Sequence, residues 1–208
     1  MKPSNVLLLP GWQNSGPEHW QSRWERSCGF QRVEQHDWMR PLRGDWIARL
    51  EEVLLGCDEP AVLVAHSLGC IQVAAWAAHS RQAHRVKAAL LVAAPDVERA
   101  DLRATLPSWS PVPRQALPFT TLQLASTDDP FCSLARAQAF AAAWGANITV
   151  VGPGGHLNVE SALGDWPQAF ALLQTLQGLP ASQEGRQGLG SAAPAARQSP
   201  GSSTASHR

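Results

Sequence analysis

The chain has 208 residues, 44% of them hydrophobic, and its 17 Lys and Arg residues balance its 17 Asp and Glu residues. This length is enough for one domain with a sizeable core. The neutral charge excludes the basic surface of proteins that bind nucleic acid or anionic lipid, so we expect neither nucleic acid nor a membrane as a partner. The apolar run at residues 6–9 is too short for a signal peptide or a spanning helix, which favours a cytoplasmic location.

Short apolar runs alternate with longer amphipathic ones along most of the chain. In chain order they predict a strand at residues 6–9, a helix at 18–27, a strand at 33–38, a helix at 44–55, a strand at 61–65, a helix at 70–78, strands at 88–93 and 120–125, a helix at 134–144, a strand at 147–151 and a helix at 166–176. This alternation favours an α/β fold, a three-layer sandwich with a mostly parallel sheet covered on both faces. Right-handed crossovers make such a sheet doubly wound.

The composition changes near Gly178, after which Ser, Ala, Gly, Gln and Pro dominate and no aromatic residue occurs. Such a segment cannot bury enough surface to form a core, so we predict a folded domain at 1–177 and a disordered tail at 178–208. The four cysteines lie far apart and form no C-x-x-C pair: Cys28, Cys57, Cys70 and Cys132. We therefore expect neither disulfides nor a zinc site, and no cofactor.

Ser67 lies in the pentapeptide AHSLG (residues 65–69), between a predicted strand and a predicted helix. That is the setting of the nucleophile elbow G-x-S-x-G, in which small residues flank a serine raised on a sharp turn. Ala65 takes the place of the first glycine, which departs from the pattern. The alternative is a serine that only caps the helix. We expect a structural role for His66, because its side chain leaves such a turn in another direction.

A serine hydroxyl needs a base to take its proton and an acid to orient that base. In enzymes with this elbow, the acid and then the histidine follow the serine, each after a later strand. Asp128 and Asp129 follow the predicted strand at 120–125, and His156 follows the next strand on a glycine-rich turn. Asp129 precedes Pro130 and is also a natural helix N-cap, and His156 could be a surface residue. Local spacing does not decide between the two aspartates.

The oxyanion of an acyl-transfer transition state needs hydrogen-bond donors. One candidate is the backbone N–H of Leu68, directly after Ser67. The second candidate is the N–H of Trp12, in the Pro-Gly-Trp segment that follows the first predicted strand. Gly11 in that segment is equally consistent with an ordinary turn.

Four segments together resemble the small serine hydrolases typified by retinoblastoma-binding protein nine and its bacterial relatives: LPGWQNSGPEHWQSRWE (9–25), AHSLG (65–69), STDDPF (126–131) and GGHLN (154–158). The resemblance covers the predicted domain and implies a trimmed α/β-hydrolase fold of about six strands. It implies Ser67 as nucleophile, Asp129 as acid and His156 as base. It also brings His19 and Trp20 near the mouth of the site, although Trp20 has the spacing of a core residue.

We therefore expect hydrolysis of a small ester, thioester or amide through an acyl-serine intermediate. Residues 94–118 offer the only room for a lid, which favours an open site for small acyl groups. An interaction protein on a hydrolase fold is the alternative, with the nine tryptophans as a possible binding surface. Acyl transfer to an acceptor other than water is a third hypothesis.

Leu55, Cys57 and Glu59 match L-x-C-x-E, a motif by which some proteins bind retinoblastoma-type pocket proteins. Leu55 also completes a predicted amphipathic helix, and the rest of the motif is the loop before the next strand. We therefore do not expect pocket-protein binding through this segment.

Overall fold

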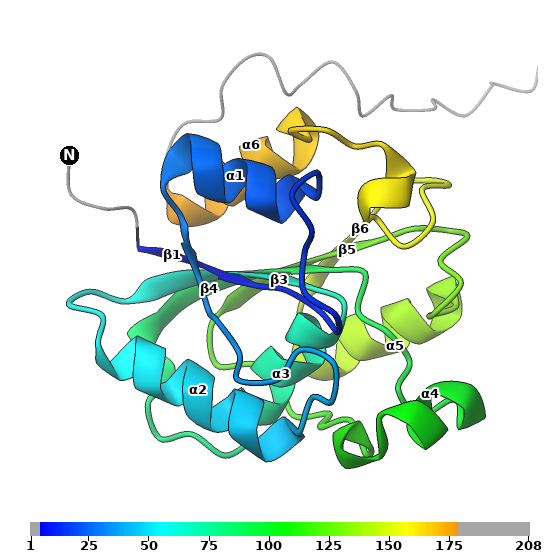
Figure 1. The fold of residues 1–208 in the computed structure, drawn as a ribbon, viewed down its shortest axis with the longest axis horizontal. Helices are drawn as coiled ribbons and strands as arrows, with labels where there is room; N and C mark the ends of the chain where they lie inside the picture. The colour runs from blue at the N-terminus through cyan, green and yellow to red at the C-terminus, as the bar shows by residue number, and fades with distance from the viewer. Residues whose placement is uncertain (1–4, 179–208) are drawn as a thin grey trace, which may run out of the picture.

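The computed structural model describes residues 5–178 and contains one sheet of six parallel strands (Figure 1). The strands are β1 (Val6–Leu9), β2 (Gln31–Arg32), β3 (Ala61–His66), β4 (Val86–Val92), β5 (Thr120–Ala125) and β6 (Asn147–Val150). Their order in the sheet is β2-β1-β3-β4-β5-β6. The predicted tail lies outside the described residues from position 179 onward, and the predicted domain boundary stays a prediction.

Helices cover both faces of the sheet. They are α1 (Trp20–Cys28), α2 (Arg43–Leu55), α3 (Leu68–Ala77), α4 (Ala100–Thr105), α5 (Leu134–Trp144) and α6 (Pro167–Gln177), together with the 3-10 helices η1 (Ala83–Arg85), η2 (Pro107–Trp109) and η3 (Val159–Ser161). In Figure 1, α1 and α6 lie above the sheet, and α2, α3 and α5 lie below it. The three-layer, doubly wound α/β architecture predicted from the sequence is confirmed.

Each face of the sheet has its own apolar core, because successive side chains of a strand point to opposite faces. Leu7 and Leu9 pack with Trp46 on the α2, α3 and α5 face, and Val6 and Leu8 pack on the α1 and α6 face. Six tryptophans are among the largest fully buried side chains: Trp20, Trp24, Trp46, Trp76, Trp109 and Trp144. Burying a large apolar side chain stabilises a fold by roughly 1.5–3 kcal/mol. These six tryptophans therefore build the core and are not available to form the binding surface of the alternative hypothesis.

The prediction of a strand at residues 33–38 is wrong. The second strand is β2, only two residues long, and the N–H of Val33 still donates to the carbonyl of Leu8 at 2.9 Å. Beyond it, the Asp37 carboxylate accepts the N–H groups of Met39 and Arg40 at 2.8 and 2.9 Å. This local turn offers the backbone of the expected strand an alternative to the ladder.

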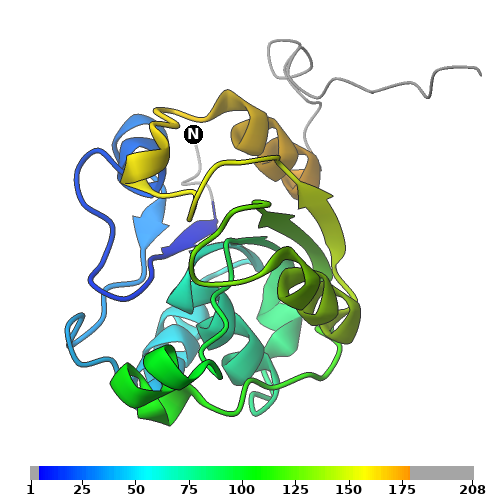
Figure 2. The ribbon, with the colours of Figure 1, turned by 90° about the vertical axis from the view of Figure 1, so that its right-hand side faces the viewer.

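The strand order reverses between β1 and β3. The chain leaves β1 toward α1 on one face of the sheet and leaves β3 toward α3 on the other (Figures 1 and 2). In open parallel sheets, loops that separate in this way leave a crevice at the carboxyl ends of the strands, where ligands bind. The residues that follow β1 and β3 therefore border the expected ligand-binding crevice.

Candidate active site

Ser67 stands at the sharp turn between β3 and α3. Its backbone has φ 53° and ψ −124°, a conformation that a non-glycine residue rarely adopts. Its side chain makes no capping hydrogen bond to α3, so the alternative of a mere helix cap is not supported. Helix α3 begins at Leu68, two residues earlier than predicted, directly after the serine. Backbone strain at a residue whose hydroxyl does not cap the helix is typical of a functional position.

Two glycines allow the chain to pass close to this turn. A Cβ atom on Gly69 would lie 2.3 Å from the carbonyl oxygen of Leu9, so only glycine fits where α3 meets the end of β1. A Cβ atom on Gly11 would lie 2.7 Å from the Cβ of Ser67, so the segment after β1 runs directly beside the serine. Ala65 is fully buried within β3, and its extra methyl group is accommodated.

The structure brings together three side chains from loops that follow different strands. The Nε2 atom of His156 lies 2.8 Å from the hydroxyl oxygen of Ser67. The Nδ1 atom of His156 lies 3.0 Å from each carboxylate oxygen of Asp129. Because a carboxylate only accepts, Nδ1 carries the proton, which leaves the Nε2 lone pair to accept the Ser67 hydroxyl. The side chains of His156 and Asp129 are only 9% and 4% exposed. Such a chain of groups can remove the proton of a serine hydroxyl.

Asp129 does not cap a helix, which was the alternative role offered by its position before Pro130. The next helix, α5, begins only at Leu134, and its cap is Ser133, whose hydroxyl accepts the N–H of Arg136 at 3.3 Å. Asp129 instead accepts the N–H of Phe131 at 2.9 Å and closes a short turn. One carboxylate therefore shapes its own loop and holds the imidazole of His156.

Comparison with known proteins identifies the family of the chain. The family model described as serine hydrolase matches residues 6–175. The chain belongs to this family. A search of curated proteins found no match.

Solved structures of hydrolases share the fold of this serine hydrolase. A YdeN-like hydrolase from Pectobacterium atrosepticum is 29% identical with a TM-score of 0.71, and the match covers 83% of this chain and 88% of that chain. The ydeN gene product from B. subtilis is 19% identical with a TM-score of 0.66, covering 83% and 98%. Thermogutta terrifontis esterase 2 is 15% identical with a TM-score of 0.62, covering 88% of each chain. The sheet is thus a trimmed version of the α/β-hydrolase fold.

Asp128 has a different environment from Asp129 in this serine hydrolase. Its Oδ1 atom accepts the hydroxyl of Ser126 at 2.6 Å and the N–H groups of Gly154 and Gly155 at 2.8 and 2.9 Å. These donors favour the charged form and lower the pKa of Asp128 to about 2, with the Ser126 hydroxyl as the largest cause. Asp128 therefore braces the loop that carries His156.

His66 is buried and its Nε2 atom lies 2.9 Å from the backbone carbonyl of His156. A carbonyl oxygen only accepts, so Nε2 donates. Burial is the main cause that holds the pKa of His66 well below its usual value, and the ring is therefore neutral. His66 thus has the structural role that was expected. Its hydrogen bond connects the turn around Ser67 to the backbone of His156.

The two expected oxyanion donors lie at the same cavity as Ser67. Leu68 is the first residue of α3, so its N–H has no acceptor within the helix. The N–H of Trp12 has no acceptor among residues 5–178. Both residues line the cavity together with Ser67 and His156. Two uncommitted N–H groups beside a serine are suited to binding a negatively charged oxygen.

The cavity has a volume of about 630 Å³. Part of its wall comes from the segment expected to be the only room for a lid, which contains the short helix α4. Leu102 of α4 and Leu106 just beyond it are 8% and 4% exposed and line the cavity. Phe131 also lines it, with its ring edge-on to His156 at a centroid distance of 4.6 Å. Sequence reasoning missed both α4 and Phe131.

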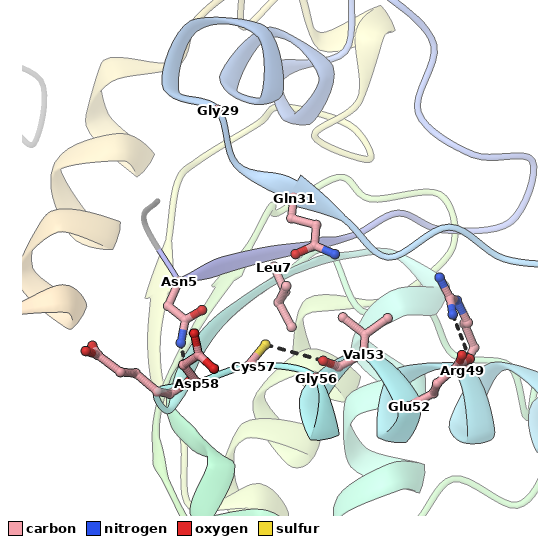
Figure 3. A pocket seen from close by; sticks show the side chains of 11 residues that line it. Asn5, Leu7, Gly29, Gln31, Arg49, Glu52, Val53, Gly56, Cys57 and Asp58 are labelled. Carbon is pink, nitrogen blue, oxygen red and sulfur yellow. Dashed lines mark hydrogen bonds and ion pairs between the residues drawn. The ribbon is translucent and has the colours of Figure 1, made fainter. Parts of the chain in front are cut away.

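A larger cavity of about 810 Å³ lies at the opposite edge of the sheet (Figure 3). Asn5 and Gln31, at the amino ends of β1 and β2, line it together with the end of α2. Its cation, Arg49, is paired with Glu52 at 2.6 Å. Parallel sheets bind ligands at the carboxyl ends of their strands, so the smaller cavity beside Ser67 is the candidate active site.

The L-x-C-x-E segment borders the larger cavity. Leu55 is the last residue of α2, and the thiol of Cys57 donates to the carbonyl of Val53 at 3.3 Å (Figure 3). Gly56 also donates its N–H back to Glu52 at 3.2 Å. The segment is therefore folded onto the end of the helix. The expectation that it is not a docking motif stays a prediction.

All four cysteines are free, as expected, and Cys70 and Cys132 are buried. Burial raises the pKa of the Cys132 thiol to about 12, so this residue near the site is not a rival nucleophile.

Within residues 5–178, no cluster of three or more His, Cys, Asp or Glu side chains is arranged to hold a metal ion. None of the helices in the described part of the chain is long and apolar enough to cross a membrane.

Proposed function

We propose that this serine hydrolase cleaves a small carboxylic ester, thioester or amide through an acyl-enzyme intermediate on Ser67. His156 is the general base and then the general acid, and Asp129 orients and stabilises its imidazolium. The 2.8 Å separation between Nε2 of His156 and the Ser67 hydroxyl is the observation that carries the proposal. It is a hydrogen bond along which the proton can pass as the oxygen attacks.

In the first half of the reaction, the Ser67 oxygen attacks the substrate carbonyl carbon while its proton passes to Nε2 of His156. The carbonyl oxygen becomes an oxyanion that accepts the N–H groups of Leu68 and Trp12. The intermediate then expels the leaving group, which takes the proton from His156. The products are acyl-Ser67 and a free alcohol, thiol or amine.

In the second half, a water molecule attacks the acyl carbon and gives its proton to His156. The tetrahedral intermediate collapses, the bond to the Ser67 oxygen breaks, and that oxygen regains the proton. The released product is a carboxylic acid. Asp129 accepts a hydrogen bond from the Nδ1–H of His156 throughout and stays unprotonated, which keeps Nε2 able to take up and return the transferred proton.

The lining of the cavity supports small apolar acyl groups as substrates. Leu102 and Leu106 give it an apolar wall, and a volume of about 630 Å³ is within the usual range for small-molecule sites. The segment that forms this wall is short and leaves the site partly open. A long lipid chain would extend beyond it into water, whereas a short acyl chain would be covered.

A fluorophosphonate tests the nucleophile directly, because the activated serine oxygen displaces its fluoride and forms a stable phosphonate ester. We expect one adduct in the intact mass of the wild-type protein and none in Ser67→Ala. His156→Ala should react far more slowly. Ser133→Ala, which removes an exposed serine at the start of α5, is the control and should react like the wild type.

Two results would contradict the proposal. A folded wild-type protein that forms no adduct and hydrolyses no activated ester would support the interaction-protein alternative. An adduct that persists in Ser67→Ala would identify another nucleophile. Hydrolysis in the presence of added alcohols separates transfer to water from transfer to another acceptor, because only the second yields a new ester.

A further inference from the structure

The cavity beside Ser67 has two walls of different chemistry. Leu102 and Leu106 form an apolar wall, whereas His19 and Asn158 lie on a wall with polar groups. Leu106 packs in the core on the α2, α3 and α5 face, and Leu157, next to Asn158, packs in the core on the α1 and α6 face. Figures 1 and 2 show the corresponding elements, α4 and η3, on opposite sides of the sheet edge. A substrate bound at Ser67 therefore meets one apolar and one polar side.

His19 on the polar wall has an unusual hydrogen-bonding state. Its side chain is at the N-cap of α1, where Nδ1 accepts the N–H of Gln21 at 3.2 Å. In a neutral imidazole the other nitrogen, Nε2, then carries the proton. That Nε2 is buried and has no hydrogen-bond partner within residues 5–178, although the residue is only 4% exposed and lines the cavity. A buried donor without an acceptor is rare in a native fold and calls for an explanation.

The neutral state of this ring has a clear cause. The pKa of His19 is lowered to about 4, mainly by burial of the ring and to a smaller extent by the nearby Arg32 and His156. The ring therefore does not act as a cation near neutral pH. It offers a single N–H, which suits a neutral acceptor such as an ether, hydroxyl or carbonyl oxygen.

The ring of His19 belongs to a cluster of histidines that includes the catalytic base and lines the cavity. The ring of His66 lies 4.7 Å from that of His19 and 5.0 Å from that of His156, so the three histidines form one cluster. In the proposed mechanism the leaving-group atom accepts a proton from Nε2 of His156. The rest of the leaving group then extends past His156 and along the wall to which His19 belongs.

We propose that the Nε2–H of His19 donates a hydrogen bond to an oxygen in the leaving group of the substrate. The enzyme thus selects esters or thioesters whose alcohol or thiol part is polar, while the acyl part is apolar. This inference rests on the proposed function, because it takes the orientation of the substrate from the proton transfer by His156. His19 is a specificity-determining residue that forms no bond with the reacting carbon.

Two pairs of esters of butanoic acid test the proposal. The n-butyl and 2-methoxyethyl esters differ only in one CH₂ group replaced by an oxygen, and the n-propyl and 2-hydroxyethyl esters differ in a methyl group replaced by a hydroxyl. The measured quantity is the ratio of kcat/KM between the oxygenated ester and its partner. Inherent differences in leaving-group reactivity cancel when this ratio is compared between the wild type and a variant.

Two substitutions separate the two nitrogens of the ring. His19→Asn keeps a good N-cap but lacks a donor at the reach of Nε2. His19→Gln keeps an N–H donor at that reach but is a poor cap. We expect the ratio to fall by about 3- to 10-fold in His19→Asn for at least one ester pair, the size of one lost hydrogen bond, and to be largely kept in His19→Gln. Ser133→Ala removes the cap of α5 away from the cavity and should leave the ratio unchanged.

The outcomes distinguish this inference from the proposed function. Equal ratios in the wild type, His19→Asn and His19→Gln, with all three enzymes active, overturn the role of His19 and leave the triad intact. The role of His19 is also overturned if the ratio correlates with the unfolding temperature of the variants and not with the presence of an N–H donor at position 19. If no ester is hydrolysed and Ser67 forms no fluorophosphonate adduct, the proposed function has failed, and this inference fails with it.

Discussion

The Oδ1 atom of Asp128 accepts the backbone N–H of Gly154 at 2.8 Å and so joins the loop after β5 to the loop after β6. The first loop also carries Asp129 and the second carries His156, whose side chains meet at 3.0 Å. The two consecutive carboxylates thus have different roles. Asp128 fixes the distance between the loops through a backbone N–H group, and Asp129 contacts the imidazole of His156.

This division predicts different effects for the two aspartates. Asp129→Asn replaces an acceptor by an amide that can donate to Nδ1 and stabilise the wrong tautomer of His156, so kcat should fall by on the order of 10⁴-fold. Asp128→Ala removes the brace of the His156 loop, and a displacement of about 1 Å in that loop should lower kcat by about 10- to 100-fold. Steady-state hydrolysis of an activated butanoate ester measures both.

Asp128→Asn is the matched control, because it keeps an acceptor oxygen for the glycine N–H groups. It should retain more activity than Asp128→Ala. If Asp128→Asn loses as much activity as we expect of Asp129→Asn, while Asp129→Asn stays active, the acid is Asp128 and our assignment is wrong.

The sequence predicted those features of the site that depend on local signals. The turn around Ser67 was visible because the residues two before and two after it, Ala65 and Gly69, are small, and Gly69 sits where a side chain would collide with Leu9. The glycine-rich turn before His156 was visible for a similar reason. Both signals lie within a few residues of the group that they position.

Features that depend on distant contacts were not predictable in this way. Asp128 and Asp129 have nearly the same neighbours in sequence, and only the approach of the loop after β6 gives them different partners. The Asp37 carboxylate closes a turn within the segment expected to be a strand at residues 33–38. Helix α4 was missed because its six residues are too few to give a clear period. The unpartnered nitrogen of His19 is likewise a property of the folded chain alone.

The close approach of α3 to β1 predicts a large effect at Gly69. A Cβ atom there would lie 2.3 Å from the Leu9 carbonyl oxygen, so Gly69→Ala has to move either the helix or the strand. We expect a loss of about 3 kcal/mol or more in the free energy of unfolding, the upper end for overpacking a core. Urea titration followed by tryptophan fluorescence measures it.

Gly44→Ala is the control for this substitution. Gly44 lies in α2, and an added Cβ atom would meet nothing within 4 Å. Its replacement should raise the free energy of unfolding by up to about 1 kcal/mol, because alanine is the better helix former. Equal stability of Gly69→Ala and the wild type would show that α3 and β1 are not packed as described.

The apolar wall predicts a dependence on acyl chain length. In a series of p-nitrophenyl esters, kcat/KM should rise by about 3- to 4-fold for each added CH₂ group while the chain is covered, which corresponds to about 0.8 kcal/mol per group. It should stop rising once the chain extends past Leu102 and Leu106. Leu102→Ala shortens a side chain of this wall and so enlarges the cavity, which should move the optimum to a longer acyl chain.

Thr105→Ala, on the exposed side of the same helix, is the matched variant and should leave the optimum unchanged. An optimum that does not move in Leu102→Ala would mean that the acyl chain does not contact α4. Efficient hydrolysis of long-chain triglycerides by the wild type would contradict the preference for small acyl groups.

The buried histidines predict that the protein loses stability as the pH falls. The pKa of His19 is about 4 in the folded protein against 6.5 for the exposed group, and that of His66 is also lowered. Between these values the unfolded chain binds a proton that the folded chain does not, so the free energy of unfolding decreases as the pH falls below 6.5 and its full value is present above it. The shift at His19 corresponds to about 3 kcal/mol between pH 7 and pH 4.

Urea unfolding at a series of pH values between 7.5 and 4.5 measures this loss. In His19→Asn one such proton is absent, so the slope of the free energy of unfolding against pH should be smaller by up to about 1.4 kcal/mol per pH unit below pH 6. His84→Asn, which removes an exposed histidine, should keep the slope of the wild type. The carboxylates titrate alike in all three proteins, so a slope in His19→Asn equal to that of the wild type would mean that His19 is protonated as readily in the folded chain as in water.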